Sequence, residues 1–287
     1  MNWNTAASAL RSADAHHRSD GVETTVTIAD NGSLAAQREL LRAGAAERDW
    51  LALRLEHGNL GYGAAVNRAL EGTAAELVCA SNADLIPSAQ MLSMLAEVAL
   101  QEPRAGLVAP ALGDGYHARL PAPWSLPLRA FWGGAGHRTV SVVGPAGAAT
   151  VLDVEQPAGA CLMARTEVWR ELGGFDGRFL LWFEDVDLAR RSLGAGYRNL
   201  VVAGARAEHA GAEAFALVDP TERQRIRLQS LARYTAKHHR RWRPATAAAI
   251  ALARPLRTGE LSAPEPEELA QRLTPRFDQP GRVELGE

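Results

Sequence analysis

The sequence contains little cysteine and no long apolar run, and both absences exclude classes of protein. Cys79 and Cys161 are the only cysteines among 287 residues, whereas a small disulfide-stabilised secreted domain would contain many more. Each lies in an apolar stretch far from the other, so we interpret both as buried free thiols in a reducing compartment. No apolar run approaches the roughly 20 residues that a membrane-spanning helix needs. The N-terminal residues 1–4 also lack the charged start and apolar centre of a signal peptide.

These absences predict a cytoplasmic protein, either free or peripheral at the inner face of the membrane. Its formal net charge of -2 excludes a general nucleic-acid binder, which would be strongly basic. Hydrophobic residues make up 47% and charged residues 22% of the chain, an ordinary globular composition. The length allows one large domain or two small ones.

The first third of the chain alternates between β-rich runs and helical stretches. The predicted strands are 22–28, 51–55, 76–80 and 106–109, and the predicted helices are 34–48, 61–70 and 88–101. Such alternation favours an α/β fold with a mostly parallel sheet and helices on both faces. Ligands of these sheets bind at the carboxyl ends of the strands. Asp30 and the Asn82-Ala83-Asp84 turn both lie at such ends.

The remaining two thirds predict an acceptor half and a helical extension. Residues 113–150 are rich in Gly, Pro and Trp and predict a long functional loop. Strands are predicted at 151–154 and 197–202, and helices at 166–172, 184–194, 220–243 and 245–256. We therefore divide the chain into a catalytic domain at 1–212, with halves at 1–112 and 113–212, a basic helical extension at 213–257 and a Pro/Glu-rich tail at 258–287.

Two short acidic segments could carry chemistry. The turn that contains Asn82 and Asp84 either holds a divalent cation through oxygen ligands or caps the segment that begins near Pro87. In Glu184-Asp185-Val186-Asp187, three carboxylates follow an aromatic run. They are either acids of a first helical turn, stabilised by the helix dipole, or they include a general base whose pKa burial raises.

His209 lies just after the predicted strand 197–202. A lone histidine is most often a surface or core residue, but neutral imidazole is also a common metal ligand. The chain offers Asp84 as its partner at such a site.

Taken in order, these segments resemble glycosyltransferase family 2, in particular its bacterial rhamnosyltransferase-like branch. The resemblance covers roughly residues 2–212 and depends on eight short motifs. They are Asp30-Asn31-Gly32-Ser33; Asn59, Gly61 and Asn67; Asn82-Ala83-Asp84; Gly159-Ala160 with Arg165; Gly173 to Asp176; Glu184 to Leu188; Gly196-Tyr197; and His209.

The resemblance implies a GT-A fold, with a mixed, mostly parallel sheet flanked by helices, and a role for each motif residue. It implies that Asp30 binds the nucleotide base, with Asn59, Gly61 and Asn67 near the base and ribose. It places Asn82 and Asp84 at the donor diphosphate, with Asp84 and His209 binding Mg²⁺ or Mn²⁺. Asp185 would be the general base, Glu184 would orient the acceptor, and Asp187 would organise the site.

One feature departs from the family pattern. Members begin with an apolar strand that ends in a turn like Trp3-Asn4-Thr5 and forms a wall of the nucleotide pocket. Almost nothing precedes that turn here, so we expect either that the start of the sequence is assigned too late or that the sheet lacks its first strand. Such a gap would expose unpaired strand edges and apolar surface.

The basic segment Arg223–Arg243 allows three interpretations. It is a packed helix with a solvated basic side, a contact with an anionic membrane surface or acceptor diphosphate, or a contact with an acidic carrier protein that presents the acceptor.

The leading hypothesis is an inverting glycosyltransferase that uses a metal and a single displacement. Its donor would be a dTDP-deoxysugar of the rhamnose type, or a UDP-hexose or UDP-N-acetylhexosamine. Its acceptor would be a hydroxyl or amine of a saccharide, lipid-linked or small-molecule substrate in cell-envelope or secondary-metabolite synthesis. The alternatives are a degenerate nucleotide-sugar binding protein without turnover and a nucleotidyltransferase of related fold. The second is disfavoured because no Gly-rich, basic triphosphate loop occurs near the N-terminus.

Overall fold

The computed structural model describes residues 1–112, 116–132, 139–140, 142, 150–209, 214 and 217–258. Parts of the predicted loop (113–115, 133–138, 141 and 143–149), the predicted boundary at 212–213 and the predicted tail from 259 onward lie outside the described residues. The strands are β1 (Val26–Asp30), β2 (Leu51–Leu55), β3 (Leu77–Ser81), β4 (Leu85–Pro87), β5 (Ala105–Ala111), β6 (His117–Ala118), β7 (Thr139–Val140), β8 (Val151–Asp153), β9 (Cys161–Arg165) and β10 (Arg198–His209).

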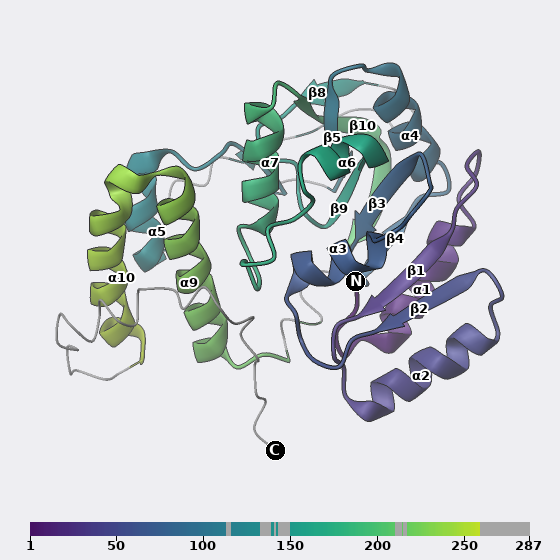
Figure 1. The fold of residues 1–287 in the computed structure, drawn as a ribbon, viewed down its shortest axis with the longest axis horizontal. Helices are drawn as coiled ribbons and strands as arrows, with labels where there is room; N and C mark the ends of the chain where they lie inside the picture. The colour runs from purple at the N-terminus through teal and green to yellow at the C-terminus, as the bar shows by residue number, and fades with distance from the viewer. Residues whose placement is uncertain are drawn as a thin grey trace.

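Helices cover the sheets and form a separate group beside them (Figure 1). The α-helices are α1 (Ala6–His17), α2 (Ala35–Ala46), α3 (Tyr62–Leu70), α4 (Met91–Gln101), α5 (Leu126–Trp132), α6 (Thr166–Glu171), α7 (Glu184–Gly194), α9 (Pro220–His238) and α10 (Arg243–Thr258), and the short 3-10 helices are η1 (Pro123–Ser125) and η2 (Arg240–Trp242). None of the helices in these described ranges has an apolar stretch long enough to cross a bilayer.

The larger sheet has the strand order β3-β9-β5-β10-β4, with β8 paired to β10. The predicted α/β fold with a mixed sheet flanked by helices is confirmed. Parallel pairs are fewer than expected, however, because only β5 and β10 pair in parallel within this sheet.

The difference arises largely from 161–165, which the sequence analysis assigned to no element. These residues form β9, which lies between β3 and β5 and antiparallel to both. The chain leaves β5 and enters β9 at the same end of the strands, since Cys161, the first residue of β9, pairs with Ser81, the last residue of β3. A return of this kind makes an antiparallel neighbour, whereas a parallel one needs a crossover.

The core of the larger sheet lies on both of its faces, as strand alternation requires. In β5, Leu107 contacts a cluster with Trp169 and Phe175. Its neighbour Val108 belongs to the cluster on the other face, which includes Leu95 of α4. Every residue of β5 from 105 to 110 is buried, so this strand is the centre of the fold.

β1 and β2 form a separate parallel pair. Among the described residues, β1 pairs only with β2, and one isolated bridge joins Asn2 to Asp30. α1, α2 and these two strands enclose a small core of their own, with Ile28, Leu41 and Leu51 buried in it.

The helical extension consists of α9 and α10, and α5 packs against both. Figure 1 shows these three helices on the far side of α7 from β3. Asp219 caps α9 by accepting from the backbone N–H groups of Thr221 and Glu222. The predicted helix 220–243 ends earlier, at His238, and η2 precedes α10. Pro244 explains the break, because proline suits the first turn of a helix and disrupts its interior.

Candidate active site

The antiparallel pairing of β4 with the end of β10 brings the two predicted metal ligands together. His209 lies opposite Leu85 in this ladder, and Asp84 directly precedes Leu85. The Nε2 atom of His209 is 3.1 Å from Oδ1 of Asp84, and their side chains are 10% and 12% exposed. The pair is therefore largely shielded from water yet still reachable by a ligand.

Two further groups fix the His209 ring. Its Nδ1 lies 3.2 Å from the hydroxyl of Tyr116, and the side-chain amide nitrogen of Asn82 lies 3.2 Å from Nε2. Nε2 of His209 thus faces both the Asn82 amide and the Asp84 carboxylate, and a neutral ring with its proton on Nδ1 would leave Nε2 and the carboxylate as two adjacent acceptors. A cation between these two acceptors would satisfy both.

The chemistry of these groups fits a divalent metal. A carboxylate oxygen and an imidazole nitrogen suit Mn²⁺, and Mg²⁺ is commonly held by one or two carboxylates together with substrate phosphates. No group of three or more His, Cys, Asp or Glu side chains that could hold a metal occurs in the part of the chain that the structure describes. Asp84 and His209 would therefore hold such a metal together with the phosphates of a bound diphosphate.

Asp185 lies in the first turn of α7 and is held by three donors. Its Oδ1 accepts from the backbone N–H of Val186 at 2.8 Å. Its Oδ2 accepts from the side chain of Gln156 and from the backbone N–H of Gly159, each at 3.3 Å. Burial raises the pKa of Asp185, and these hydrogen bonds oppose the rise. A carboxylate that is oriented in this way, with a raised pKa, is suited to accept a proton.

Glu184 differs from Asp185 although the two are adjacent. It is 8% exposed, and its Oε2 has no hydrogen-bond partner among the described residues. Burial, together with the negative charge of Asp185, raises the pKa of Glu184 to about 8. With this pKa, Glu184 keeps its proton at neutral pH and can donate a hydrogen bond, which is compatible with the acceptor-orienting role predicted for it.

Residues 159–160 connect the Asp84–His209 pair to Asp185. The backbone N–H of Asn82 donates to the carbonyl of Ala160 at 2.8 Å, and Gly159 donates to Asp185 from the adjacent residue. A Cβ at Gly159 would lie only 2.8 Å from the Cβ of Asp185, so this approach requires glycine. The hydroxyl of Tyr62 also donates to the Gly159 carbonyl, at 3.2 Å. The two centres thus belong to one hydrogen-bonded assembly.

The chain enters α7 through two strained residues. Trp182 and Phe183 have φ angles of 62° and 68°, a region that bulky side chains rarely adopt. Such strain persists only where the surroundings impose it, and it concentrates at functional sites. Here it turns the chain so that α7 begins with Glu184 and Asp185, and Phe183 packs on Tyr234 of α9.

Asp187, the third acid, contacts the C-terminal extension. It is fully buried and accepts from Arg191 Nε at 2.8 Å, His238 Nε2 at 2.7 Å and Lys237 Nζ at 2.6 Å. Burial pushes the pKa of Asp187 upward, but the hydrogen bonds from His238 and Lys237 and the charge of Arg191 outweigh it, and the pKa is lowered. This carboxylate joins α7 to α9, and its role in organising the site stays a prediction.

Asp30 lies at the end of β1 and is fully buried. Its carboxylate accepts from the side chain of Asn2 at 2.8 Å and from the backbone N–H of Ser33 at 3.2 Å, and Arg38 is 3.8 Å away. These contacts organise the 30–33 turn. A contact of Asp30 with a nucleotide base stays a prediction.

The other predicted nucleotide residues contact the protein itself. Asn59 Oδ1 accepts from the Asn31 side chain and from the N–H of Gly61. Gly61, with a φ of 88°, permits close approach to the backbone of Leu180. Asn67 both donates to and accepts from the backbone of Phe175, at 2.7 and 3.0 Å. All three hold α3 and the turn before it in place, and their contact with donor stays a prediction.

Three side chains at the site, Gln156, Tyr116 and Tyr62, carried no recognised signal as site residues. Tyr116 lies in the long segment that matched no motif, and Gln156 follows β8 in an irregular stretch. The Gly159-Ala160 motif did indicate the segment that contacts Asp185, but only the fold shows what it contacts.

Comparisons with known proteins relate the chain to glycosyltransferases. No family model matches the chain. Over 209 residues, 64% of the chain, it is 29% identical to N-acetylglucosaminyl-diphospho-decaprenol L-rhamnosyltransferase of Mycobacterium tuberculosis, and it spans 66% of that relative's length.

Two solved structures share the fold. The mannosyltransferase PcManGT from Pyrobaculum calidifontis, in complex with GDP-Man and Mn²⁺, is 19% identical with a TM-score of 0.57, over 95% of this chain and 76% of that one. GalNAc-T7, with UDP, GalNAc and Mn²⁺, is 15% identical with a TM-score of 0.56, over 85% of this chain and 46% of that one. The solved structures show a GT-A-like fold, and the chain resembles glycosyltransferases of family 2 through its distant similarity to the mycobacterial L-rhamnosyltransferase.

Proposed function

We propose that this protein transfers a sugar from a nucleotide-diphosphate sugar to a hydroxyl or amine acceptor, with inversion at the anomeric carbon. One observation carries the proposal. The Asp84–His209 pair and the Asp185 carboxylate belong to one hydrogen-bonded assembly, connected through Asn82, Ala160 and Gly159.

The chemistry of such a transfer needs groups on both sides of the anomeric carbon. On the acceptor side, Asp185 would take the proton from the acceptor as it attacks. Protonated Glu184 would donate a hydrogen bond to the acceptor and hold it in place. On the other side, Asp84 and His209 would hold a divalent cation, which when bound stabilises the charge of the departing diphosphate. A single base without a second carboxylate nucleophile in the assembly favours one displacement, hence inversion.

The comparisons favour particular substrates for this proposal. The matched relative is by name an L-rhamnosyltransferase that acts on a lipid-linked diphospho-sugar, which favours a rhamnose-type deoxysugar donor over a UDP-hexose. Both solved neighbours contain Mn²⁺, which supports a metal at Asp84 and His209.

A basic surface on η2 supports an acceptor at a membrane. Arg240, Arg241 and Arg243 are exposed, and Trp242 beside them is 36% exposed. Cations next to an interfacial aromatic favour anionic headgroups or a lipid diphosphate. Other cations of the same basic segment, such as Lys237, are used internally, so only part of Arg223–Arg243 is available to a partner.

The test is a transfer assay with and without metal. Purified protein is incubated with dTDP-rhamnose, UDP-glucose or UDP-N-acetylglucosamine and a lipid-diphosphate saccharide acceptor, first with Mn²⁺ and then with EDTA. We expect turnover with one donor, its loss in EDTA and its return with excess Mn²⁺. Turnover that EDTA leaves unchanged would contradict the metal role. Donor binding without turnover on any acceptor would favour a binding protein instead.

A further inference from the structure

Arg129, on α5, is a buried cation with one unpartnered edge. The residue is 5% exposed, and its Nε and Nη2 atoms have no hydrogen-bond partner among the described residues. Burial lowers the pKa of the guanidinium, because a dry interior disfavours a charge that nothing balances. Buried charges in proteins are normally paired, so this edge is suited to an anion.

The unpartnered edge is the one with which other arginines of this chain bind carboxylates. Arg48 donates from Nε and Nη2 to the two oxygens of Asp14, at 2.7 and 2.8 Å. Arg198 binds Asp153 through the same two atoms, at 2.8 and 2.6 Å. Such a planar fork matches two oxygens of a carboxylate or a phosphate. The geometry of Arg129 therefore indicates an oxyanion as its partner.

The backbone around Arg129 is held in place by α9. Arg227 donates to the carbonyls of Arg129 and Ala130, at 2.6 and 3.2 Å. Side chains of α5, α7, α9 and α10 also share one core cluster that contains Tyr234. Arg129 is thus presented by a packed junction of helices.

Further cationic and polar groups surround Tyr234. The charges of Arg129 and Arg190 both act on its hydroxyl, and the His239 ring lies 5.7 Å from its ring. Burial, followed by the charges of Arg190 and His238, lowers the pKa of His239 to about 4. The Nε2 atom of His239 is buried and has no hydrogen-bond partner in the described part of the chain. These groups together favour a ligand that carries negative charge.

Asp187 does not balance this cluster. Its charge also reaches Tyr234, but three other cationic side chains already donate to it. An added anion would therefore find Arg129 and Arg190 available as partners.

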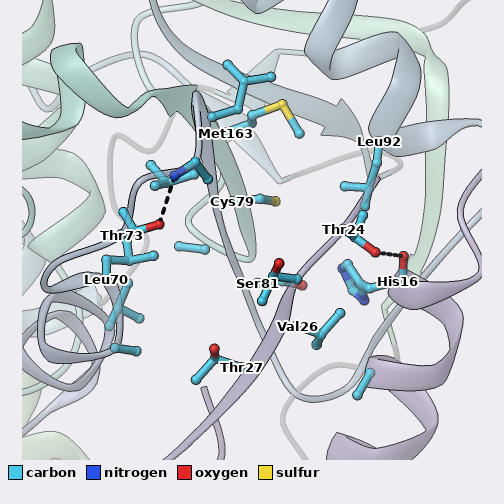
Figure 2. Close-up of a pocket in the computed structure, with 18 of the residues that line it drawn as sticks. His16, Thr24, Val26, Thr27, Leu70, Thr73, Cys79, Ser81, Leu92 and Met163 are labelled. Carbon is cyan, nitrogen blue, oxygen red and sulfur yellow. Dashed lines mark hydrogen bonds between the residues drawn. The ribbon is translucent and has the colours of Figure 1, made fainter. Parts of the chain in front are cut away.

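The large cavity between β1 and β3 does not suit such a ligand. It has a volume of about 810 Å³, and Figure 2 shows Thr27 and Cys79 in its lining. Glu23 and Glu76 also line it, whereas no lysine or arginine of the described residues does. An oxyanion is better matched by the helical junction at Arg129.

We propose that Arg129, with Arg190 and His239 beside it, forms an oxyanion site that binds the diphosphate of the acceptor. This assignment of the ligand rests on the proposed function. The site contains two arginines, more positive charge than one carboxylate balances, and a diphosphate supplies several charged oxygens to such a group.

The position of the site favours the acceptor over the donor. The Tyr234 ring lies 5.2 Å from the ring of Phe183, which directly precedes Glu184. Arg190 follows Asp185 on α7 by about 7.5 Å along the helix axis. The site therefore lies on the side of α7 and α9, where the acceptor is expected, and away from the β4–β10 edge that would hold the donor diphosphate.

The binding experiment uses pyrophosphate as the probe, with EDTA present so that no metal-bound diphosphate contributes. It compares the unaltered full chain with Arg129→Met and with the control Arg241→Gln, which removes one exposed positive charge outside the site. At matched ionic strength, saturating pyrophosphate should raise the Tm of the unaltered and control proteins by about 5 °C. It should leave the Tm of Arg129→Met unchanged.

The same variant separates ligand binding from a structural role. Without pyrophosphate, Arg129→Met should unfold at the Tm of the unaltered protein or above it, because the buried charge is gone. No shift in the unaltered protein, or an equal shift in Arg129→Met, would overturn the site. If that variant does not fold, Arg129→Lys keeps the charge without the fork and should weaken pyrophosphate binding by about tenfold; unchanged affinity would overturn the site equally.

Two further arms identify the source of the oxyanion. Inorganic phosphate should bind at least about tenfold more weakly than pyrophosphate, since it lacks the second charged group. In transfer assays, Arg129→Met should raise the KM for a water-soluble, short-chain lipid-diphosphate saccharide by about 10- to 100-fold and leave the donor KM unchanged. An alkyl glycoside of the same saccharide, which has no diphosphate, should show equal KM with both proteins.

Equal binding of phosphate and pyrophosphate, or an unchanged KM for the diphosphate acceptor, would overturn the assignment to the acceptor. The pyrophosphate experiment needs no turnover. A protein that transfers no sugar therefore contradicts the proposed function and still shows whether the oxyanion site exists.

Discussion

At the scale of single residues, Asp185 is set apart by how firmly its carboxylate is held. Three donors fix it: the N–H groups of Val186 and Gly159 and the side chain of Gln156. We expect Asp185→Asn to lower the transfer rate by about 10²- to 10⁴-fold, because an amide cannot take a proton. Donor affinity, measured by isothermal titration calorimetry, should change little, since the substitution leaves Asp84 and His209 unchanged. Turnover near that of the unaltered protein would refute the assignment of the base.

Glu184 predicts an unusual dependence of stability on pH. Its pKa of about 8 in the folded protein lies above its ordinary value of 4.5. Between these values the folded protein keeps a proton that the unfolded chain has released, so the free energy of unfolding falls as pH rises from 4.5 to 8. Glu184→Gln removes this loss, since the amide stays neutral. Its Tm should therefore exceed that of the unaltered protein by a margin that grows with pH up to about 8.

The margin can be measured by thermal unfolding from about pH 5 to 9, a range that spans the folded pKa. Glu47→Gln is the matched control, because the Glu47 side chain is 80% exposed and should give a nearly constant difference. Parallel curves for Glu184→Gln and the unaltered protein would show that the buried carboxyl does not titrate as the structure implies.

The sequence predicted one pair of neighbours at the site and missed most of the other contacts. Asp84 and His209 could be paired because both belong to motifs with known chemistry, and the structure confirms that they are adjacent. The partners of Asn67 and Gly61 could not be predicted, because Phe175 and Leu180 lie far from them in the chain. A local pattern does not specify contacts that the fold creates.

At the scale of elements, the junction of α7 and α9 depends on one buried carboxylate. Asp187 accepts from Arg191, Lys237 and His238. We expect Asp187→Asn to lower the free energy of unfolding by about 3–5 kcal/mol, because Asp187 is fully buried and the partly buried Arg191 and Lys237 lose their counter-charge. Asp153→Asn removes the ion pair of Asp153 with Arg198. The Asp153 side chain is 63% exposed, so this variant should lower the free energy of unfolding by about 1 kcal/mol or less. Urea unfolding of the two variants measures the contrast, and equal losses would count against the buried network.

The strands that alternate with helices could be predicted from the sequence, but the antiparallel strand β9 could not. The apolar runs that became β1, β2, β3 and β5 carry the alternation that indicates α/β structure. β9 is apolar as well, but the irregular stretch before it contains no helix that would indicate a strand. Its position between β3 and β5 follows from where the chain returns to the sheet, which no window of sequence records.

At the scale of the whole molecule, the proposed donor site draws on two sheets. Asp30 ends β1 in the two-stranded sheet, whereas Asp84 and His209 belong to the β4–β10 edge of the larger one. A nucleotide diphosphate that contacts both would connect them. Since Asp84 and His209 would hold the cation together with the diphosphate, the diphosphate and the cation should each need the other to bind tightly.

This dependence predicts that Mn²⁺ and a nucleoside diphosphate stabilise the fold together more than they do separately. A ligand raises the Tm according to its affinity for the folded state. We therefore expect small shifts with Mn²⁺ alone or dTDP alone, and a combined shift well above their sum. His209→Ala should reduce the combined shift to about that sum. Asp185→Asn should leave the combined shift as large as in the unaltered protein, because Asp185 does not contact Asp84 or His209. Additive shifts in the unaltered protein would show that the diphosphate does not complete the coordination at Asp84 and His209.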